Sequence, residues 1–174
     1  MRILILQYLQ PRIDLKAIKA TERSYFVGLM SLFVGSRAGS FFLGNDVRFR
    51  LHPESNPDEY LKFAAERKLR RLDFDDHDVP LRKSLKWADL VICPASSGAA
   101  LEAIGAGKRT YLVLLPPHSQ DARYFRGAKI FETVDAVRHA FAIGMNPDHS
   151  EFFERYTSRK QIPAPAKAIW AVLS

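Results

Sequence analysis

The sequence has one cysteine, Cys93, among 174 residues, and it lacks any long apolar run. A single cysteine excludes a disulfide framework and any zinc site built from several cysteines. The longest apolar stretch, Tyr25 to Val34, is far below the roughly 18 to 20 residues of a membrane-spanning helix. Ile3 to Leu6 is too short for the core of a signal peptide. We therefore expect a cytoplasmic protein in a reducing compartment.

Several nucleotide-binding and catalytic signatures are also missing. No Gly-x-Gly-x-x-Gly follows the first apolar run, which disfavours a nicotinamide or flavin enzyme. Gly105 to Lys108 lacks the spacing of a phosphate-binding loop, and Ser97-Gly98 is not part of a hydrolase Gly-x-Ser-x-Gly elbow. The acidic run Asp73 to Asp78 fits neither a calcium loop nor a zinc pattern. The sequence thus predicts no resident metal or other cofactor.

What the sequence does have is an ordinary globular composition with an excess of positive charge. Hydrophobic residues make up 47% and charged residues 26%, and the formal net charge is +7. This excess favours anionic partners. The basic run Lys62 to Arg71 is interpreted as a solvated surface; the alternative is a patch that docks an acidic acceptor or the inner face of a membrane. Nucleic acid is not favoured, because no recognition signature accompanies the charge.

Short apolar runs alternate with helical patterns along the chain. Strands are expected at Arg2–Gln7, Val47–Leu51, Leu72–Phe74, Leu90–Cys93, Thr110–Leu115 and Lys129–Phe131. Helices are expected after Thr21, Asn56-Pro57, Pro80, Ser96 or Ser97, and Thr133, where capping residues or prolines favour a helix start. This alternation predicts an α/β fold: a single Rossmann-like domain with about six parallel strands and helices on both faces.

The length is that of one domain. We assign 1–145 to the Rossmann-like domain and 146–174 to a C-terminal helical extension, in which Pro163 and Pro165 separate two helical pieces. Right-handed crossovers bring every strand-to-helix loop to one edge of a parallel sheet. Ligands of open α/β sheets bind at that edge, so candidate residues are sought directly after each strand.

The loop after the second strand contains His52-Pro53. Proline holds the preceding residue extended, so we expect His52 to be aimed toward the ligand edge. An imidazole there can donate a hydrogen bond to a phosphate. Arg50 has a planar guanidinium suited to phosphate oxygens, and strand alternation places it on the same side as His52. The alternative interpretation is an ordinary turn with a solvated arginine.

The loop after the fourth strand contains Ser96, Ser97 and Gly98. Helix N-termini expose backbone amides and attract anions, and two hydroxyls add further donors. Glu102, in the second turn of the same helix, could accept hydrogen bonds from ribose hydroxyls. The alternatives are a plain serine cap and a surface glutamate.

The His52-Pro53 pair, followed by the stretch Ala88 to Lys108, resembles the C-terminal half of GT-B glycosyltransferases. The families that look most similar are bacterial sialyl- and polysialyltransferases, Kdo transferases and teichoic-acid glycerophosphotransferases. The Leu-Glu-Ala…Gly-Lys part is also similar to lipid-linked N-acetylglucosaminyltransferases. The resemblance covers Val47 to Leu115.

The resemblance implies a site for a CMP-sugar or CDP-polyol, in an enzyme of cell-surface polysaccharide synthesis such as capsule. His52, with Pro53 in the motif, and Ser96 and Ser97 would hold the phosphate of the leaving nucleotide, and Glu102 would contact its ribose. His52 is the residue expected to act in catalysis, by stabilising the leaving group.

The chain departs from these families in one respect that bears on activity. Their catalytic base lies in an acidic pair before glycine in the N-terminal half, whereas Asp75-Asp76 precedes His77 here. Whether this chain is an enzyme is therefore left open. It could be a truncated or inactive transferase, one domain of a larger protein, or a subunit whose partner supplies the other half. The alternative function is a non-catalytic Rossmann-like module that binds a partner protein or a polyanion.

Overall fold

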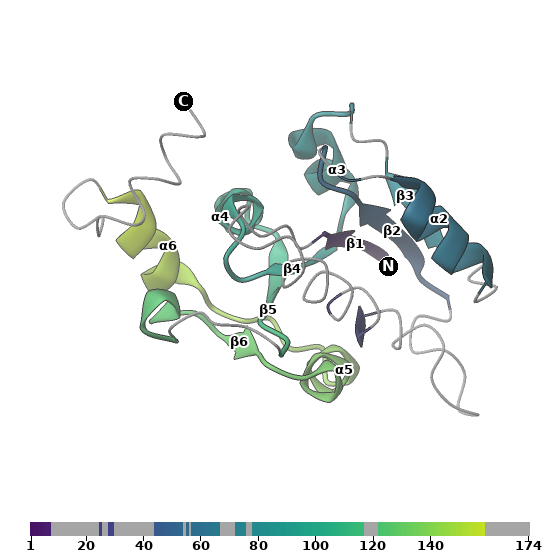
Figure 1. The fold of residues 1–174 in the computed structure, drawn as a ribbon. Helices are drawn as coiled ribbons and strands as arrows, with labels where there is room; N and C mark the ends of the chain where they lie inside the picture. Colours follow the sequence, from purple (N-terminus) through teal and green to yellow (C-terminus); the bar gives the residue numbers. More distant parts are fainter. Residues whose placement is uncertain are drawn as a thin grey trace.

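The structure is a computed structural model that describes residues 1–7, 25, 28–29, 44–53, 55, 57–66, 72–75, 78–116 and 122–158. Along this part of the chain the elements are β1 (Arg2–Leu6), β2 (Asp46–Arg50), α2 (Pro57–Glu66), β3 (Leu72–Asp75), α3 (Leu81–Trp87), β4 (Leu90–Pro94), α4 (Gly98–Gly105), β5 (Arg109–Val113), the 3-10 helix η1 (Ala122–Phe125), β6 (Ile130–Phe131), α5 (Val134–Ala142) and α6 (Ser150–Thr157) (Figure 1).

The strands form one parallel sheet in the order β3-β2-β1-β4-β5-β6. The predicted α/β class, Rossmann-like architecture, parallel sheet and number of strands are confirmed. Observed strand ends differ from the predicted ones by one or two residues. For example, β5 ends at Val113 rather than at Leu115.

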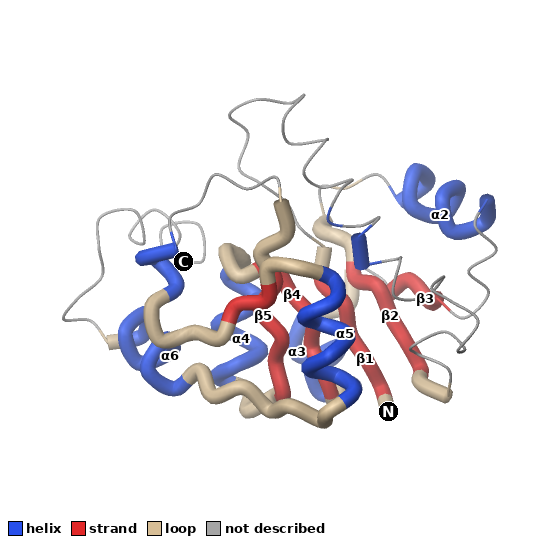
Figure 2. The backbone as a smooth tube through the Cα atoms, turned by 90° about the horizontal axis from the view of Figure 1, so that it is seen from below, coloured by secondary structure: helices blue, strands red, loops and turns tan. Residues whose placement is uncertain are grey.

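Side chains that alternate along the strands divide the core into two clusters. Ile3 and Ile5 of β1 face one side, together with residues of α2 and α5, while Leu4 and Leu6 face α3, α4 and α6. Figure 2 shows α5 on one side of the strands and α3 and α4 on the other. The helices therefore cover both faces, as strands with near-continuous apolar sequences require.

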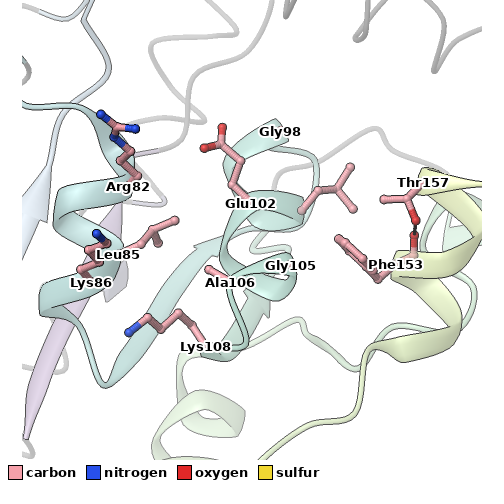
Figure 3. Close-up of a pocket in the computed structure, with 11 residues that line it drawn as sticks. Arg82, Leu85, Lys86, Gly98, Glu102, Gly105, Ala106, Lys108, Phe153 and Thr157 are labelled. Carbon is pink, nitrogen blue, oxygen red and sulfur yellow. Dashed lines mark hydrogen bonds between the residues drawn. The ribbon is translucent and has the colours of Figure 1, made fainter.

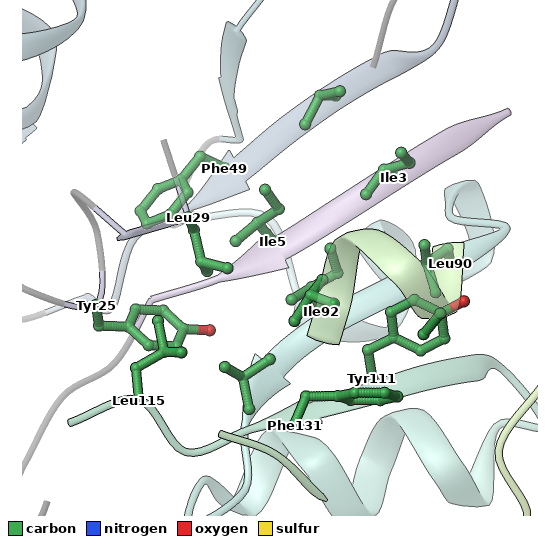
Figure 4. Close-up of a cluster of buried hydrophobic side chains, with 14 of the residues drawn as sticks. Ile3, Ile5, Tyr25, Leu29, Phe49, Leu90, Ile92, Tyr111, Leu115 and Phe131 are labelled. Atoms are coloured by element: carbon green, nitrogen blue, oxygen red, sulfur yellow. The ribbon is translucent and has the colours of Figure 1, made fainter. Parts of the chain in front are cut away.

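The first of these clusters is aromatic as well as aliphatic. Phe49 of β2 stacks on Tyr60 of α2, with 6.0 Å between ring centroids, and Tyr111 of β5 lies 5.0 Å from Phe131 of β6 (Figure 4). Tyr111 is fully buried, and its hydroxyl donates to the carbonyl of Met145, 2.9 Å away. The buried phenol hydroxyl thus has a backbone carbonyl as its hydrogen-bond acceptor in place of water.

Two predicted helix starts are confirmed at the level of single hydrogen bonds. The Ser97 hydroxyl accepts from the Ala99 N–H at 3.2 Å at the start of α4, and the Thr133 hydroxyl accepts from the Ala136 N–H at 3.1 Å at the start of α5. Each cap satisfies a backbone donor that lacks a partner within the helix.

The first helix of the proposed C-terminal extension, α6, packs against the sheet domain. Phe152 is 3% exposed, and His149 next to it is 5% exposed. The His149 Nδ1 accepts from the Lys129 N–H at 3.3 Å, so Nε2 carries the proton and donates to the Thr110 carbonyl at 2.9 Å. The helix expected after Thr21 and the pieces around Pro163 and Pro165 lie outside the described residues, apart from Tyr25, Gly28 and Leu29, which are helical.

Candidate functional site

The strand order places the two candidate loops on either side of β1. Leu6 pairs with Arg50 of β2, and Ile5 pairs with Ile92 of β4, so the loops that follow β2 and β4 leave the sheet beside Gln7. At this point successive strands are added in opposite directions, which is where open α/β sheets form their ligand crevice. The two loops are separated by two strand spacings, or about 10 Å.

The loop after β2 is a four-residue turn. The Ser55 N–H donates to the His52 carbonyl at 2.9 Å, and Pro53 occupies the second position, where its fixed φ suits the turn. His52 and Pro53 are exposed. His52 lies in the loop after the strand, as predicted, and it is the first residue of the turn.

Gln7, at the end of β1, fastens this turn to the sheet. Its side-chain oxygen accepts from the His52 N–H at 2.6 Å and from the Ser55 hydroxyl at 2.7 Å. Its side-chain nitrogen donates to the hydroxyl of Tyr60 on α2, and its own N–H donates to the Arg50 carbonyl at 2.9 Å. Gln7 is only 8% exposed. One buried amide thus connects β1, the turn and α2.

The loop after β4 has a turn of the same kind. The Ser97 N–H donates to the Pro94 carbonyl at 3.1 Å, which closes a second four-residue turn. Because the Ser97 oxygen accepts from Ala99, its own proton stays available to a ligand. Ser96, Ser97 and Gly98 are half-buried at the start of α4. Hydroxyls and backbone amides therefore gather at a helix N-terminus, where a negative charge is stabilised.

Arg50 is placed differently from what the sequence led us to expect. Arg50 is 9% exposed, and its guanidinium donates to Asp75 at 3.2 Å, to the Ser84 hydroxyl at 2.9 Å and to the Val79 carbonyl. Ser84 also donates to Asp75. This buried cluster ties β2 to β3 and α3 on the face of the sheet opposite Gln7. We therefore leave Arg50 out of the proposed ligand contacts.

Gly98 and Glu102 line a cavity of about 770 Å³ on the outer side of α4 (Figure 3). Its walls are α3, with Arg82 and Lys86, and α6, with Phe153. The ring of Phe153 packs so closely on α4 that a Cβ added at Gly105 would lie 3.0 Å from it. Glu102 is exposed and lies about one turn further along α4 than Ser97 and Gly98, which are at the start of the helix.

Two buried side chains, Cys93 and His149, are not part of the candidate site. Burial raises the pKa of the Cys93 thiol far above its ordinary range, because charge on the sulfur would be desolvated. Cys93 therefore stays protonated and packs as a small apolar side chain, as expected from its place at the end of a strand. His149 is held as described above. His118, which topology would also place at the ligand edge, lies outside the described residues.

In the part of the chain that the structure describes, no group of three or more His, Cys, Asp or Glu side chains is arranged to hold a metal ion. The described helices are all too short or too polar to cross a membrane. Comparison with known proteins gives no matching family model and no significant match among curated proteins.

Gln7 and Tyr60 are residues of this site that were not predicted from the sequence. Gln7 was included at the end of an apolar strand, where a lone amide among apolar neighbours is itself a signal, because a buried polar side chain needs partners. Tyr60 belongs to the helix expected after Asn56-Pro57. Its ring packs on Phe49, and its hydroxyl accepts from the Gln7 amide nitrogen. Neither contact can be read from spacing along the chain.

Proposed function

We propose that this chain binds a CMP-sugar or CDP-polyol and is the nucleotide-binding half of a GT-B-like glycosyltransferase of cell-surface polysaccharide synthesis. The observation that carries the proposal is the strand order, which puts the His52 turn and the Ser96-Ser97 turn on the two sides of β1 at the carboxyl edge. The sequence resemblance gives the ligand class, and the fold class agrees with it.

The proposed chemistry is stabilisation of a leaving group. With a CMP-sugar, an acceptor hydroxyl attacks the anomeric carbon, the bond from that carbon to the phosphate oxygen breaks, and CMP departs. With a CDP-polyol, the hydroxyl attacks the phosphorus that carries the polyol, the bond from that phosphorus to the oxygen of the CMP phosphate breaks, and CMP departs. In both cases negative charge develops on the phosphate oxygens of the departing nucleotide. The His52 imidazole and the serine hydroxyls would donate to those oxygens as the charge grows. The proton of the acceptor must go to a base, which we assign to a second half supplied by a partner or by another segment.

The test is ligand binding by the chain itself. In a thermal shift assay with CMP, CDP, UDP and GDP, we expect a cytidine nucleotide at ten times its Kd to raise the Tm by about 3 to 6 °C. His52→Ala should abolish the shift. His139→Ala is the matched control, because His139 is exposed on α5, away from the carboxyl edge turns. An unchanged Tm with all four nucleotides at millimolar concentration contradicts the proposal.

A second candidate function is a non-catalytic module that binds a partner or polyanion. It is favoured by the basic face of α3, where Arg82, Lys83 and Lys86 are exposed and form no ion pair within the described residues. This function predicts salt-sensitive binding to heparin that survives His52→Ala and Ser97→Ala but is lost in an Arg82→Gln/Lys86→Gln variant. Loss of heparin binding in the His52 and Ser97 variants would contradict it.

A further inference from the structure

The side chain of Gln7 lies where the two turns meet the sheet, and it makes three hydrogen bonds to side chains or backbone far away in sequence. Both lone pairs of its oxygen are used, one by the His52 N–H at 2.6 Å and one by the Ser55 hydroxyl at 2.7 Å. These two donors are the first and last residues of the turn, whose own closing bond runs from the Ser55 N–H to the His52 carbonyl. One oxygen therefore holds both ends of the turn.

The amide is itself held in place. The His52 N–H can only donate, so it fixes the oxygen of the amide toward the turn, and the nitrogen then donates to the Tyr60 hydroxyl. The Gln7 backbone N–H continues the ladder to the Arg50 carbonyl. At 8% exposure, water has little access to compete for these bonds. The turn is thereby anchored to the central strand and not only to the end of β2.

The chemical nature of the residue also fits an anion site. A carboxylate could accept the same two hydrogen bonds, but it would add a negative charge at the edge where a phosphate is proposed to bind. An amide accepts both bonds while staying neutral. A neutral, doubly accepting group beside the turn is what a site for a negatively charged ligand requires.

We infer that Gln7 is the positioning residue of this site: its amide holds the His52–Ser55 turn in the conformation that presents His52 to a nucleotide phosphate. That the ligand is a nucleotide rests on the proposed function. That Gln7 holds the turn rests only on contacts within the protein. A turn that is already ordered lowers the entropy cost of binding, so loss of the Gln7 hydrogen bonds should weaken the affinity for the nucleotide.

The first experiment replaces Gln7 by methionine, which keeps the length of the side chain and removes its hydrogen bonds. Amide hydrogen exchange in Gln7→Met should speed up about tenfold or more at His52, because its acceptor is gone. Exchange at the Ser97 amide, which is bonded within its own turn, should stay unchanged and shows that the fold is retained. Calorimetry should show a rise of about tenfold in the Kd for CMP.

The second experiment separates position from charge. In Gln7→Glu the His52 amide should remain protected, while the ratio of cytidine Kd to CMP Kd should fall about tenfold, because only CMP carries the phosphate that the new carboxylate repels. Ser55→Ala removes one of the two donors and should produce a smaller increase in His52 exchange than Gln7→Met. This graded response is expected if the Gln7 oxygen holds both ends of the turn, and it is not expected if the substitutions destabilise the whole fold.

Unchanged exchange at His52 in Gln7→Met overturns the inference, and so does unchanged CMP affinity in a variant whose turn has loosened. Failure of the wild-type chain to bind CMP overturns the proposed function, and with it the part of the inference that concerns a nucleotide phosphate. In that case the His52 exchange measurement still decides whether Gln7 holds the turn, so the two failures are distinguishable.

Discussion

The two candidate loops have the same backbone design and different supports. Each is a four-residue turn directly after a strand, closed by a hydrogen bond from its last N–H to its first carbonyl: Ser55 to His52 after β2, and Ser97 to Pro94 after β4. The second turn is joined to β5 by a backbone hydrogen bond from the Ala95 N–H to the Val113 carbonyl at 3.0 Å, but the side-chain hydrogen bond that supports it, from the Ala99 N–H to the Ser97 hydroxyl, is local. The first is fixed by Gln7, which is 45 residues away from His52.

This difference decides how each loop responds to change. A turn whose side-chain support lies within its own segment should tolerate side-chain substitutions elsewhere. A turn supported from a distance depends on correct assembly of β1, β2 and α2 and should respond to substitutions in any of them. The following predictions test that contrast, from the largest expected effect to the smallest.

Arg50→Met should have the largest effect, because Asp75 would remain buried without its closest cation. We expect a loss of about 3 to 5 kcal/mol in the free energy of unfolding, measured in urea. His52, two residues further along the chain, should lose amide protection as well, while the Ser97 turn keeps its own. An Arg50→Met/Asp75→Leu variant should recover most of the stability. A loss below about 1 kcal/mol in the single variant would contradict the support assigned to this cluster.

Ser97→Ala should cost about 1 kcal/mol, because it removes an N-cap hydrogen bond. Thr133→Ala is the matched control: it removes an equivalent cap from α5 and should cost about the same in urea unfolding. The two variants should differ in CMP affinity, which falls in Ser97→Ala and stays at the wild-type value in Thr133→Ala. Equal affinities would show that the Ser97 hydroxyl has a capping role alone.

Asp89→Asn should have the smallest effect and leave both turns intact, since Asp89 accepts from Arg2 at the opposite edge of the sheet. The hydrogen bonds from the Arg2 side chain and backbone lower the pKa of Asp89 from 3.8 to about 2. Stability from this pair is therefore complete above pH 3.8 and is lost as the pH falls through about 2. The variant should lack that acid-range loss, measured by thermal unfolding between pH 5 and pH 2 at matched ionic strength. An unchanged pH profile would contradict the pairing.

Much of the fold could be predicted because its signals are local. Apolar runs such as Leu90–Cys93 identified strands, and Ser97 and Thr133 identified helix starts, since a cap and its partner lie within three residues of each other. Strand ends were less accurate, because the last pairing of a strand depends on its neighbour. The candidate site was predicted in part: the His52 and Ser97 turns lie at the expected edge.

The parts of the site that could not be predicted depend on which strands become neighbours in the sheet. Arg50 was expected at the ligand edge from its chemistry, but pairing of β2 with β3 and packing of α3 surround its guanidinium with Asp75 and Ser84. His149, directly before α6, is buried because α6 returns to β5. These contacts join segments that no periodicity relates.

By itself, the sequence determined the α/β class, the number of strands, the helix caps and the two candidate loops that follow strands, because each follows from the chemistry of residues close together in the chain. Tertiary structure alone decided that β2 and β4 flank β1, that Gln7 reaches the His52 turn, and that Arg50 turns away from it. The physical reason is that a buried amide or guanidinium takes whichever partners folding brings within hydrogen-bonding distance, and that choice belongs to the assembled sheet.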